Sequence, residues 1–388
     1  MKNKLLYLKA VVLYAIARVI VSFVPLKKNK FFCISMNGNS YGDNIKCLSD
    51  YIQSDIYDAQ IVWAFSSVFY KKISCTEKKV KLFTFLYYYH ILTSKYILNN
   101  GSLSFVHLIK RNGQICVNTW HGTALKRIGL DIFKTQREGF LYKYFGFNYV
   151  KYNSKITDVF ISGSHYMSDI IKEKLAYKGE ILEIGTPRND IFFRDNTEIR
   201  NRVCSFFGID NNSKIILYAP TFRSDYSFKW YNIDLLSVKN ELDTLFGENY
   251  EIMVRLHPSL MRKEKEFGSL YPYKTVNASI YPDMQELLST VDVLITDYSS
   301  CMFDFMYSNK VVIQYVPDRA TYNRGFYLDI DTLPFVIINN NSEIHHKLSK
   351  LDLRQYQSDL GIFIKKIGSV EDGHATRNTV EFILNKTK

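Results

Sequence analysis

The sequence predicts an α/β protein with two doubly wound domains, each a parallel sheet covered by helices. Three observations lead to this prediction. Short apolar, strand-like runs alternate with helix-like segments along most of the 388 residues, which is typical of parallel sheets. The alternation stops in a polar stretch from about 188 to 212 and then restarts. A chain of this length also exceeds what one hydrophobic core usually organises.

The apolar periodicity places each expected element. In the first half we expect strands at 31–36, 61–65, 96–98, 115–120, 158–162 and near Ile181, and helices at 43–52, 80–91 and from His165. In the second half we expect strands at 215–218, 251–256, 291–296 and 311–313, helices at 284–289 and 301–307, and an α-rich tail from Ser342. The predicted domains are an N-terminal apolar helix in 1–29, a first Rossmann-like domain in 30–195 and a second in 196–388.

The net charge of +12 favours a polyanionic partner, such as an anionic membrane or phosphorylated substrates. Nucleic acid is disfavoured, because the chain carries no RNP motif, Cys/His finger or basic-region helix. The six cysteines are scattered and form no C-x-x-C pair, which indicates a reducing cytoplasm without a disulfide framework or a zinc site. We expect no metal.

The segment Leu5 to Val24 is mostly apolar and, as a helix, is about as long as a bilayer core is thick. Lys9 and Arg18 interrupt it, which favours a helix in the membrane interface or packed on the domain over one that spans the membrane. A second segment, Lys71–Tyr89, combines lysines with aromatic residues and is a candidate for contact with anionic lipid headgroups.

Polar residues follow several predicted strands. An apolar run ends at Thr296, and a predicted helix follows, so its free N–H groups would form an anion site. The carboxyl ends of parallel strands meet at one sheet edge, and a cleft between two such edges would suit transfer of a phosphoryl-linked group. The strand-end residues are His121, Ser164, His165, Thr221, Arg223, Arg255, His257, Asp297, Ser299 and Ser300.

Two other motifs carry weaker hypotheses. Gly38–Gly42 matches the G-x-S-x-G elbow of hydrolases, but no glycine run of the lipase type accompanies it. Asp329 and Asp331 form a D-x-D pair of the kind that holds a metal-bound nucleotide sugar. Two acids near a strand are common by chance, so we do not adopt a metal site.

Seven motifs run in order from about Lys30 to Arg377: Asn37–Asn44, Asn118–Lys126, Gly185–Asp190, Tyr218–Arg223, Arg255–Pro258, Thr296–Ser300 and Glu371–Arg377. Together they closely resemble the motifs of the CDP-glycerol glycerophosphotransferase family, the teichoic-acid primases and polymerases and their capsule-making relatives. Ala124 and Ile45 stand where proline is common in the family. The resemblance implies that 30–195 is the acceptor-side domain and 196–388 the nucleotide-binding domain.

The resemblance implies two Rossmann-like domains that face a cleft, the GT-B arrangement. It also implies peripheral attachment to the inner face of the membrane and metal-independent transfer of glycerol phosphate from CDP-glycerol, without a cofactor. The family's two motif histidines fall on His121 and His257. The acidic-hydroxyl motif at Asp297, Ser299 and Ser300 would lie at the nucleotide's phosphates.

We therefore expect an acceptor hydroxyl to attack the β-phosphorus of CDP-glycerol, with CMP as the leaving group. His121 is the expected base, although the two histidines could exchange roles. His257 and Arg255 would neutralise the pyrophosphate, and Asp304 would accept hydrogen bonds from the ribose. Further phosphate-side candidates are Thr221 and Arg223, and acceptor-side candidates are Gly122, Thr123 and Lys126.

Two alternative functions remain open from the sequence. A GT-B glycosyltransferase would use a nucleotide sugar on the same fold, and a non-catalytic membrane protein would bind polyanionic polymer without releasing CMP. The sequence also leaves open the acceptor, primase against polymerase, glycerol against ribitol, and the oligomeric state.

Overall fold

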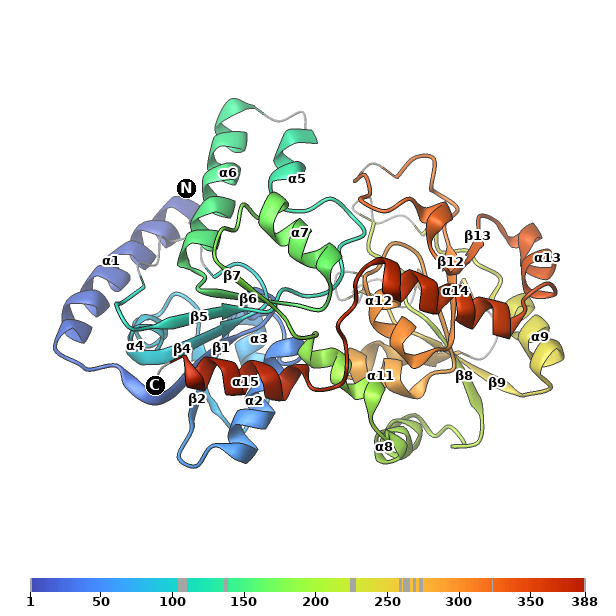
Figure 1. Ribbon diagram of the computed structural model, residues 1–388, viewed down its shortest axis with the longest axis horizontal. Helices are drawn as coiled ribbons and strands as arrows, with labels where there is room; N and C mark the ends of the chain where they lie inside the picture. Colours follow the sequence, from blue (N-terminus) through green and yellow to red (C-terminus); the bar gives the residue numbers. More distant parts are fainter. Residues whose placement is uncertain are drawn as a thin grey trace. The chain divides into compact units, whose positions relative to one another are not determined.

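The computed structural model describes residues 2–103, 110–135, 139–223, 228–257, 260, 266–267, 270–271, 275–322 and 324–386. The chain divides into two compact units (Figure 1). Unit 1 comprises Met1–His121, Ile128–Asp190 and Ser369–Lys388, and unit 2 comprises Gly122–Arg127 and Ile191–Gly368. Each unit contains one parallel sheet with helices, which confirms the predicted α/β class with two parallel-sheet domains.

The described residues of unit 1 form a seven-stranded parallel sheet in the order β3-β2-β1-β4-β5-β6-β7. The strands are β1 Lys27–Ile34, β2 Gln60–Phe65, β3 Lys78–Lys81, β4 Ser94–Asn99, β5 Ile115–Asn118, β6 Val159–Ser162 and β7 Glu180–Glu183. The helices are α1 Lys2–Ser22, α2 Asp43–Asp55, α3 Ser67–Lys72, α4 Phe85–Thr93, α5 Leu130–Thr135, α6 Phe140–Ile156, α7 His165–Lys174 and α15 Ala375–Asn385, with 3-10 turns η1 Met36–Gly38 and η2 Pro187–Phe193.

Helices cover both faces of this sheet, as its continuous apolar strands require. On one face, buried side chains from α1, α4 and α6 pack on the sheet, among them Ala17, Tyr88 and Ile156. On the other face, α2 and α15 lie side by side and contribute Leu48 and Ile383 (Figure 1). The polar strand ends therefore remain at the carboxyl edge.

Unit 2 repeats the plan with a six-stranded parallel sheet, in the part that the structure describes, in the order β10-β9-β8-β11-β12-β13. Its strands are β8 Lys214–Tyr218, β9 Tyr250–Val254, β10 Val276–Asn277, β11 Val293–Thr296, β12 Val311–Tyr315 and β13 Val336–Ile338. Its helices are α8 Thr197–Phe207, α9 Leu235–Phe246, α11 Met284–Thr290, α12 Cys301–Phe305, α13 Ile344–Leu348 and α14 Leu353–Lys366, with 3-10 turns η4 Ala278–Ile280, η5 Met306–Ser308, η6 Ile330–Thr332 and η7 Asn341–Glu343.

Three local predictions differ from the structure. The predicted helix at 80–91 begins only at Phe85, because Val80 pairs with Ala64 in the edge strand β3. The polar stretch taken as an interdomain segment contains α8, which buries Val203 and Cys204 and packs against α11. The predicted helix at 301–307 is a five-residue α-helix continued by a 3-10 turn.

The C-terminal segment returns to unit 1, which differs from the predicted boundary that assigned 196–388 to one domain. The carboxylate of Glu371 accepts hydrogen bonds from the Thr186 N–H at 2.9 Å and from the Asn189 side-chain amide at 3.0 Å. Gly163 and Gly185 lie against the same carboxylate, and an added Cβ would come within 2.3 and 3.1 Å of its oxygens.

A second carboxylate fixes the start of the last helix. Asp190 accepts hydrogen bonds from the backbone N–H groups of Ala375 and Thr376, at 2.9 and 2.8 Å. These are two of the donors that the first turn of a helix leaves without intrahelical partners. Asp190 and Glu371 thus join segments that are about half the chain apart in sequence, and composition gives no sign of that pairing.

The N-terminal segment forms α1, with Ala10, Ala17 and Val21 buried against unit 1. No helix among the described residues is long and apolar enough to cross a membrane. The prediction of an apolar N-terminal helix is therefore corrected. The helix α1 forms, but Lys9 and Arg18 interrupt its apolar surface.

The second predicted lipid-contact segment, Lys71–Tyr89, is also corrected in part. The rings of Tyr87 and Tyr88 are each 1% exposed and belong to the core, so they cannot contact lipid. Its exposed apolar side chains are Phe83 and Leu86, in the described part of that segment.

We expect Glu371→Ala to lower the free energy of unfolding by about 3 kcal/mol, since hydrogen bonds to charged groups contribute about 1.5–3 kcal/mol each. Urea titration followed by circular dichroism measures the loss. The matched control is Glu173→Ala, which removes an exposed carboxylate of the same unit. Equal stability of the two variants would show that the hydrogen bonds to Glu371 do not stabilise unit 1.

Candidate functional site

His121 lies just beyond β5, at the carboxyl edge of the sheet in unit 1. Its Nδ1 atom is 2.9 Å from the carbonyl oxygen of Asn100. A carbonyl oxygen can only accept, so we assign the ring proton to Nδ1, which leaves a lone pair on Nε2. The imidazole also stacks on the indole of Trp120, with ring centroids 4.3 Å apart. The ring is therefore held in the orientation and tautomer that a general base requires.

The surroundings of His121 favour its neutral form. Burial lowers the pKa of His121, and the positive charge of Arg188 adds to this effect. The hydrogen bond to Asn100 and the charge of Asp43 act in the opposite direction. Arg188 forms an ion pair with Asp43, with 2.8 Å between Nη1 and Oδ2, so the two charges largely offset one another.

Asn44 joins three of the family-like segments around this histidine. It is fully buried, its Nδ2 donates to the Trp120 carbonyl at 3.0 Å, and its Oδ1 accepts from the Arg188 N–H at 3.0 Å. Strained backbone accompanies the contact, with φ angles of 52° at Trp120 and 64° at Asp43. Such left-handed conformations outside glycine carry a cost and concentrate at functional sites.

In unit 2, Asp297 follows β11 and organises the neighbouring strand ends. Its carboxylate accepts from the N–H and the hydroxyl of Thr221 and from the Tyr298 N–H, and it forms an ion pair with Arg223 at 2.9 Å. The side chain of Asp297 is almost fully buried. Its oxygens are therefore occupied by protein donors.

Arg223 is held in the same network. A second carboxylate, Asp318, lies 2.7 Å from its Nε, and the guanidinium lies over the rings of Tyr298 and Tyr322 at 5.1 and 5.3 Å. Burial opposes its charge, but the carboxylates of Asp297 and Asp318 outweigh burial and raise the pKa of Arg223. Arg223 therefore has several internal partners, and its predicted place on the nucleotide phosphates stays a prediction.

Two further predicted ligands also have internal partners. Nη1 of Arg255 donates to the carbonyls of Ala278 and Tyr281, at 2.9 and 2.7 Å, and so fixes the loop before α11. Asp304 is 3% exposed and accepts a hydrogen bond from Gln285 at 3.2 Å. The predicted contact of Asp304 with the ribose stays a prediction.

Three cationic or titratable side chains of unit 2 act on one another instead. Burial and the nearby charge of Arg324 lower the pKa of Lys126 to about 8. Burial and the charge of Lys126 lower the pKa of His257, whose ring stacks on Phe222 at 5.6 Å. Pro258, the next residue of that predicted motif, lies outside the described residues. The charge of Arg324 thus acts on Lys126 and that of Lys126 acts on His257, and a bound anion would offset the repulsion in this cluster of Lys126, His257 and Arg324.

Arg324 was absent from the sequence prediction. A short antiparallel contact places it, because Lys126 pairs with Phe326 and the Arg127 N–H donates to the Gly325 carbonyl at 3.1 Å. The feature of the sequence that indicates a turn here is Gly325, which follows Arg324. Its φ of 66° is one that glycine adopts without strain.

The remaining predicted residues lie near strand ends. Ser299 accepts from the Cys301 N–H at 3.4 Å, whereas the Ser300 side chain makes no capping bond and both serines are half-buried. The helix that follows is only five residues long, so its dipole adds little to the site. Gly122 has a φ of 120°, in the region that favours glycine, and Thr123 is half-buried beside it.

The D-x-D pair has an ordinary explanation. Asp331 is exposed and forms a two-pronged ion pair with Arg319 at 2.5 Å, and Asp329 lies 3.5 Å from the same guanidinium. Among the described residues, no group of three or more His, Cys, Asp or Glu side chains could hold a metal ion.

A family model described as CDP-Glycerol:Poly(glycerophosphate) glycerophosphotransferase matches residues 16–385. The chain belongs to this family. It is 28% identical to the teichoic acid poly(glycerol phosphate) polymerase of Bacillus spizizenii, over 99% of this chain and 100% of that protein. It is 29% identical to the teichoic acid glycerol-phosphate transferase of Staphylococcus aureus, over 92% of this chain and 93% of that protein. It spans about half the length of two longer polymerases that it matches.

A solved structure of a related enzyme also matches the fold of this chain. The wall teichoic acid polymerase TagF, in a histidine-to-asparagine variant with CDPG, matches this fold with a TM-score of 0.84 at 26% identity, over 100% of this chain and 97% of that chain. As a member of this family, the chain is a glycerophosphotransferase of teichoic acid synthesis. The nucleotide-sugar and non-catalytic alternatives are therefore set aside.

For this glycerophosphotransferase, we expect Asp318→Ala to lower the free energy of unfolding by about 3 kcal/mol, since breaking a buried ion pair costs about 3–5 kcal/mol. Arg223 would keep its ion pair with Asp297, so the loss of stability should lie at the lower end of this range. Chemical denaturation measures it, and Asp329→Ala is the control because its carboxylate is exposed. A loss no larger than that of the control would show that the network does not stabilise unit 2.

Proposed function

We propose that this chain transfers glycerol phosphate, or a similar polyol phosphate, from CDP-glycerol to a hydroxyl of a lipid-linked or polymer acceptor, in teichoic acid or capsule synthesis. CMP is the product that leaves. The observation that carries this proposal is His121, whose Nδ1 is bound to the Asn100 carbonyl while its Nε2 keeps a lone pair. That arrangement suits removal of a proton from an alcohol.

In the proposed step, Nε2 of His121 takes the proton of the acceptor hydroxyl as its oxygen attacks the β-phosphorus of CDP-glycerol. A phosphorus–oxygen bond forms to the acceptor, and the bond between the β-phosphorus and the bridging oxygen breaks. That oxygen leaves with CMP. His121 supplies proton transfer, so the charge on the phosphates must be balanced by other groups.

We assign the neutralisation of the phosphate charge to Lys126, His257 and Arg324. The hydroxyls of Ser299 and Ser300 would donate hydrogen bonds to the phosphate oxygens. Lys126 remains largely protonated at neutral pH with a pKa of about 8, and a bound phosphate would raise this value. This assignment moves Lys126 from the acceptor side to the donor side, and gives Arg223, Arg255 and Asp297 a positioning role. With these cations, the proposed transfer needs no metal or cofactor.

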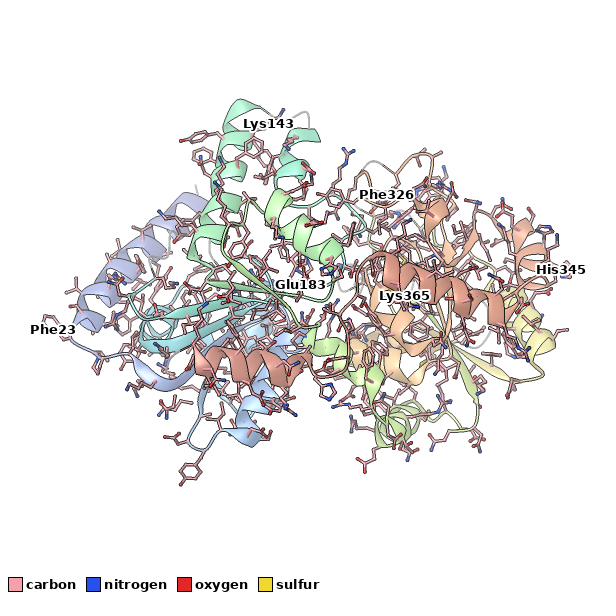
Figure 2. The ribbon with its side chains drawn as sticks, viewed as in Figure 1. Phe23, Lys143, Glu183, Phe326, His345 and Lys365 are labelled. Carbon is pink, nitrogen blue, oxygen red and sulfur yellow. The ribbon has the colours of Figure 1, made fainter. Side chains whose placement is uncertain are left out.

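We further propose peripheral attachment to the cytoplasmic face of the plasma membrane. Five large apolar side chains form an exposed stripe along α1, here called the α1 stripe: Val12, Ile16, Val19, Ile20 and Phe23. They recur at helical spacing, as in helices that lie in a membrane interface. Phe23 is 86% exposed and points away from unit 1 (Figure 2). The predicted GT-B cleft stays a prediction.

We expect His121→Ala to lower kcat by about 10²–10⁴-fold, the usual contribution of a general base. The dissociation constant of CDP-glycerol should change little, because His121 acts on the acceptor. Steady-state release of CMP and equilibrium binding of CDP-glycerol measure the two quantities. His346→Ala, in the exposed part of α13, is the control.

The pH profile tests for a histidine base, and variants of the two histidines separate their roles, because burial lowers the pKa of both. Since burial lowers the pKa of His121 below 6.5, its neutral form persists in mildly acidic solution. Activity of the native chain should hold through neutral pH and fall only below the usual pKa range of histidine, as the base becomes protonated. His257→Ala should instead weaken CDP-glycerol binding. Normal turnover in His121→Ala, with a large loss in His257→Ala, would reverse the two roles.

We expect the double variant Val19→Ser/Phe23→Ser to bind anionic vesicles at least 10-fold more weakly, because a large apolar side chain contributes about 1.5–3 kcal/mol when buried. Vesicle sedimentation measures the affinity. Turnover of a soluble acceptor should be unchanged, since neither residue belongs to the proposed site. Ile362→Ser removes a similarly exposed side chain from α14 and serves as control. Unchanged sedimentation of the double variant would refute attachment through the α1 stripe.

A further inference from the structure

The imidazole of His121 is held by a residue that stands outside the seven motifs of the family resemblance. Asn100 directly follows β4, at the carboxyl edge of the sheet in unit 1, and it is fully buried. Its carbonyl oxygen is the partner of Nδ1 of His121, at 2.9 Å. The orientation of the imidazole therefore depends on where this one carbonyl is held.

The side chain of Asn100 is bound to the neighbouring strand end. Its Oδ1 accepts a hydrogen bond from the Met36 N–H at 2.8 Å, and its Nδ2 donates to the hydroxyl of Ser35 at 3.2 Å. Ser35 and Met36 directly follow β1, which is the parallel neighbour of β4 in the sheet. Asn100 therefore contacts the end of β1 through its side chain and His121 through its main chain.

The turn that Asn100 contacts has strained backbone. Met36, Asn37 and Gly38 have successive φ angles of 46°, 55° and 80°, all in the left-handed region. Residues other than glycine adopt this region at a cost, and they keep it where the surrounding contacts over-determine it. The Asn100 side chain supplies one such contact, at the first residue of the turn. The turn and the carbonyl that binds His121 are therefore fixed by the same residue.

The backbone after Asn100 is also bound to the end of β5. Nδ2 of Asn118 donates to the Gly101 carbonyl at 2.9 Å, and its Oδ1 accepts from the Trp120 N–H at 2.9 Å. These bonds do not involve the Asn100 side chain. Loss of that side chain should therefore displace the Asn100 carbonyl while the strand end stays folded.

We propose that Asn100 is a positioning residue for the transfer reaction. Its side chain, anchored to Ser35 and Met36, holds its own carbonyl against Nδ1 of His121. That contact fixes the tautomer and the orientation of the imidazole, so that the lone pair of Nε2 stays available for the acceptor proton. Asn100 acts through His121 and does not contact the substrate. This inference rests on the proposed role of His121 as the base.

The test is Asn100→Ala, which removes both side-chain hydrogen bonds and keeps the main-chain carbonyl. We expect kcat for CMP release to fall by about 10–100-fold, because a displacement of about 1 Å in a catalytic group can cost that much. The dissociation constant of CDP-glycerol should stay unchanged. In the His121→Ala background the same substitution should cause no further loss, because its effect passes through the missing ring.

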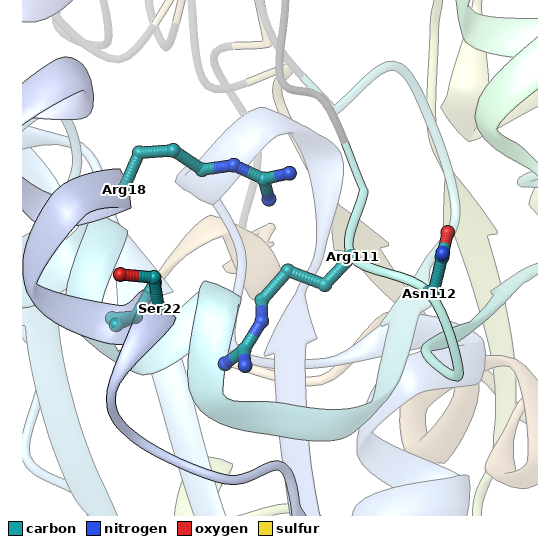
Figure 3. Close-up of a pocket in the computed structure, with 5 residues that line it drawn as sticks. Arg18, Ser22, Arg111 and Asn112 are labelled. Carbon is teal, nitrogen blue, oxygen red and sulfur yellow. The ribbon is translucent and has the colours of Figure 1, made fainter.

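Gln114→Ala is the matched control. Gln114 is a buried amide at the amino end of β5, and its Nε2 donates to two main-chain carbonyls at 2.7 Å. Its Oε1 accepts from the N–H of Arg111, which lines a cavity at this end of the strand together with Arg18 (Figure 3). The control therefore removes comparable hydrogen bonds from the same sheet, away from His121, and should leave kcat unchanged.

The pH profile gives a readout that a general loss of stability would not move. The hydrogen bond to Asn100 raises the pKa of His121, whereas burial and the charge of Arg188 lower it and the charge of Asp43 raises it. Asn100→Ala weakens only the first of these influences. The pKa of His121 should therefore fall, and the acid limb of the activity profile should shift to lower pH.

A second variant, Ser35→Ala, removes only the acceptor of Asn100 Nδ2 and decides the question if Asn100→Ala does not fold. It should shift kcat and the acid limb in the same direction by a smaller amount. Native kcat and an unmoved acid limb in the folded variants would refute the inference. An equal loss of kcat from Asn100→Ala in the native and His121→Ala backgrounds would also refute it, and the base would stand. Native turnover in His121→Ala would instead overturn the base, and the inference with it.

Discussion

The hydrogen bonds between residues 186–190 and 371–376 determine the architecture of this chain. Asp190 and Glu371 receive four protein donors across segments about 180 residues apart, and they bring α15 back beside α2. The chain consequently passes between the units at His121, Arg127, Asp190 and Gly368. Two family motifs, Gly185–Asp190 and Glu371–Arg377, contain these carboxylates and their partners. The hydrogen bonds of this closure account for the residue types at these positions.

The same reasoning separates positioning residues from candidate ligands. Asn44, Asp297, Arg223 and Arg255 each satisfy several protein donors or acceptors, so their polarity is used inside the fold. A buried polar group without partners would be costly, and these networks are dense for that reason. The residues that we propose for the chemistry are fewer: His121 in unit 1, and Lys126, His257, Arg324, Ser299 and Ser300 in unit 2. That division is consistent with an enzyme whose substrate carries most of the negative charge.

Sequence reasoning succeeded where one local pattern decides the outcome. Buried strands such as β1 and β11 are continuous apolar runs, and the polar residues that follow them could be placed at a sheet edge. Sequence reasoning failed where contacts between residues far apart in the sequence determine the structure. The location of α15 depends on Asp190 and Glu371, and the internal role of Arg223 depends on Asp318, which lies 95 residues away. Arg324 joined the site through a short pairing with 125–127, for which residue type alone gives little signal.

The α1 stripe has a further consequence for the protein in concentrated solution. Its five side chains would bury apolar area against any matching surface, including the same stripe on another copy. The net charge of +12 opposes that approach by repulsion between copies. Added salt screens the repulsion but leaves the apolar attraction intact, so colloidal stability falls as ionic strength rises. Low ionic strength is therefore the condition that best keeps copies of this chain apart.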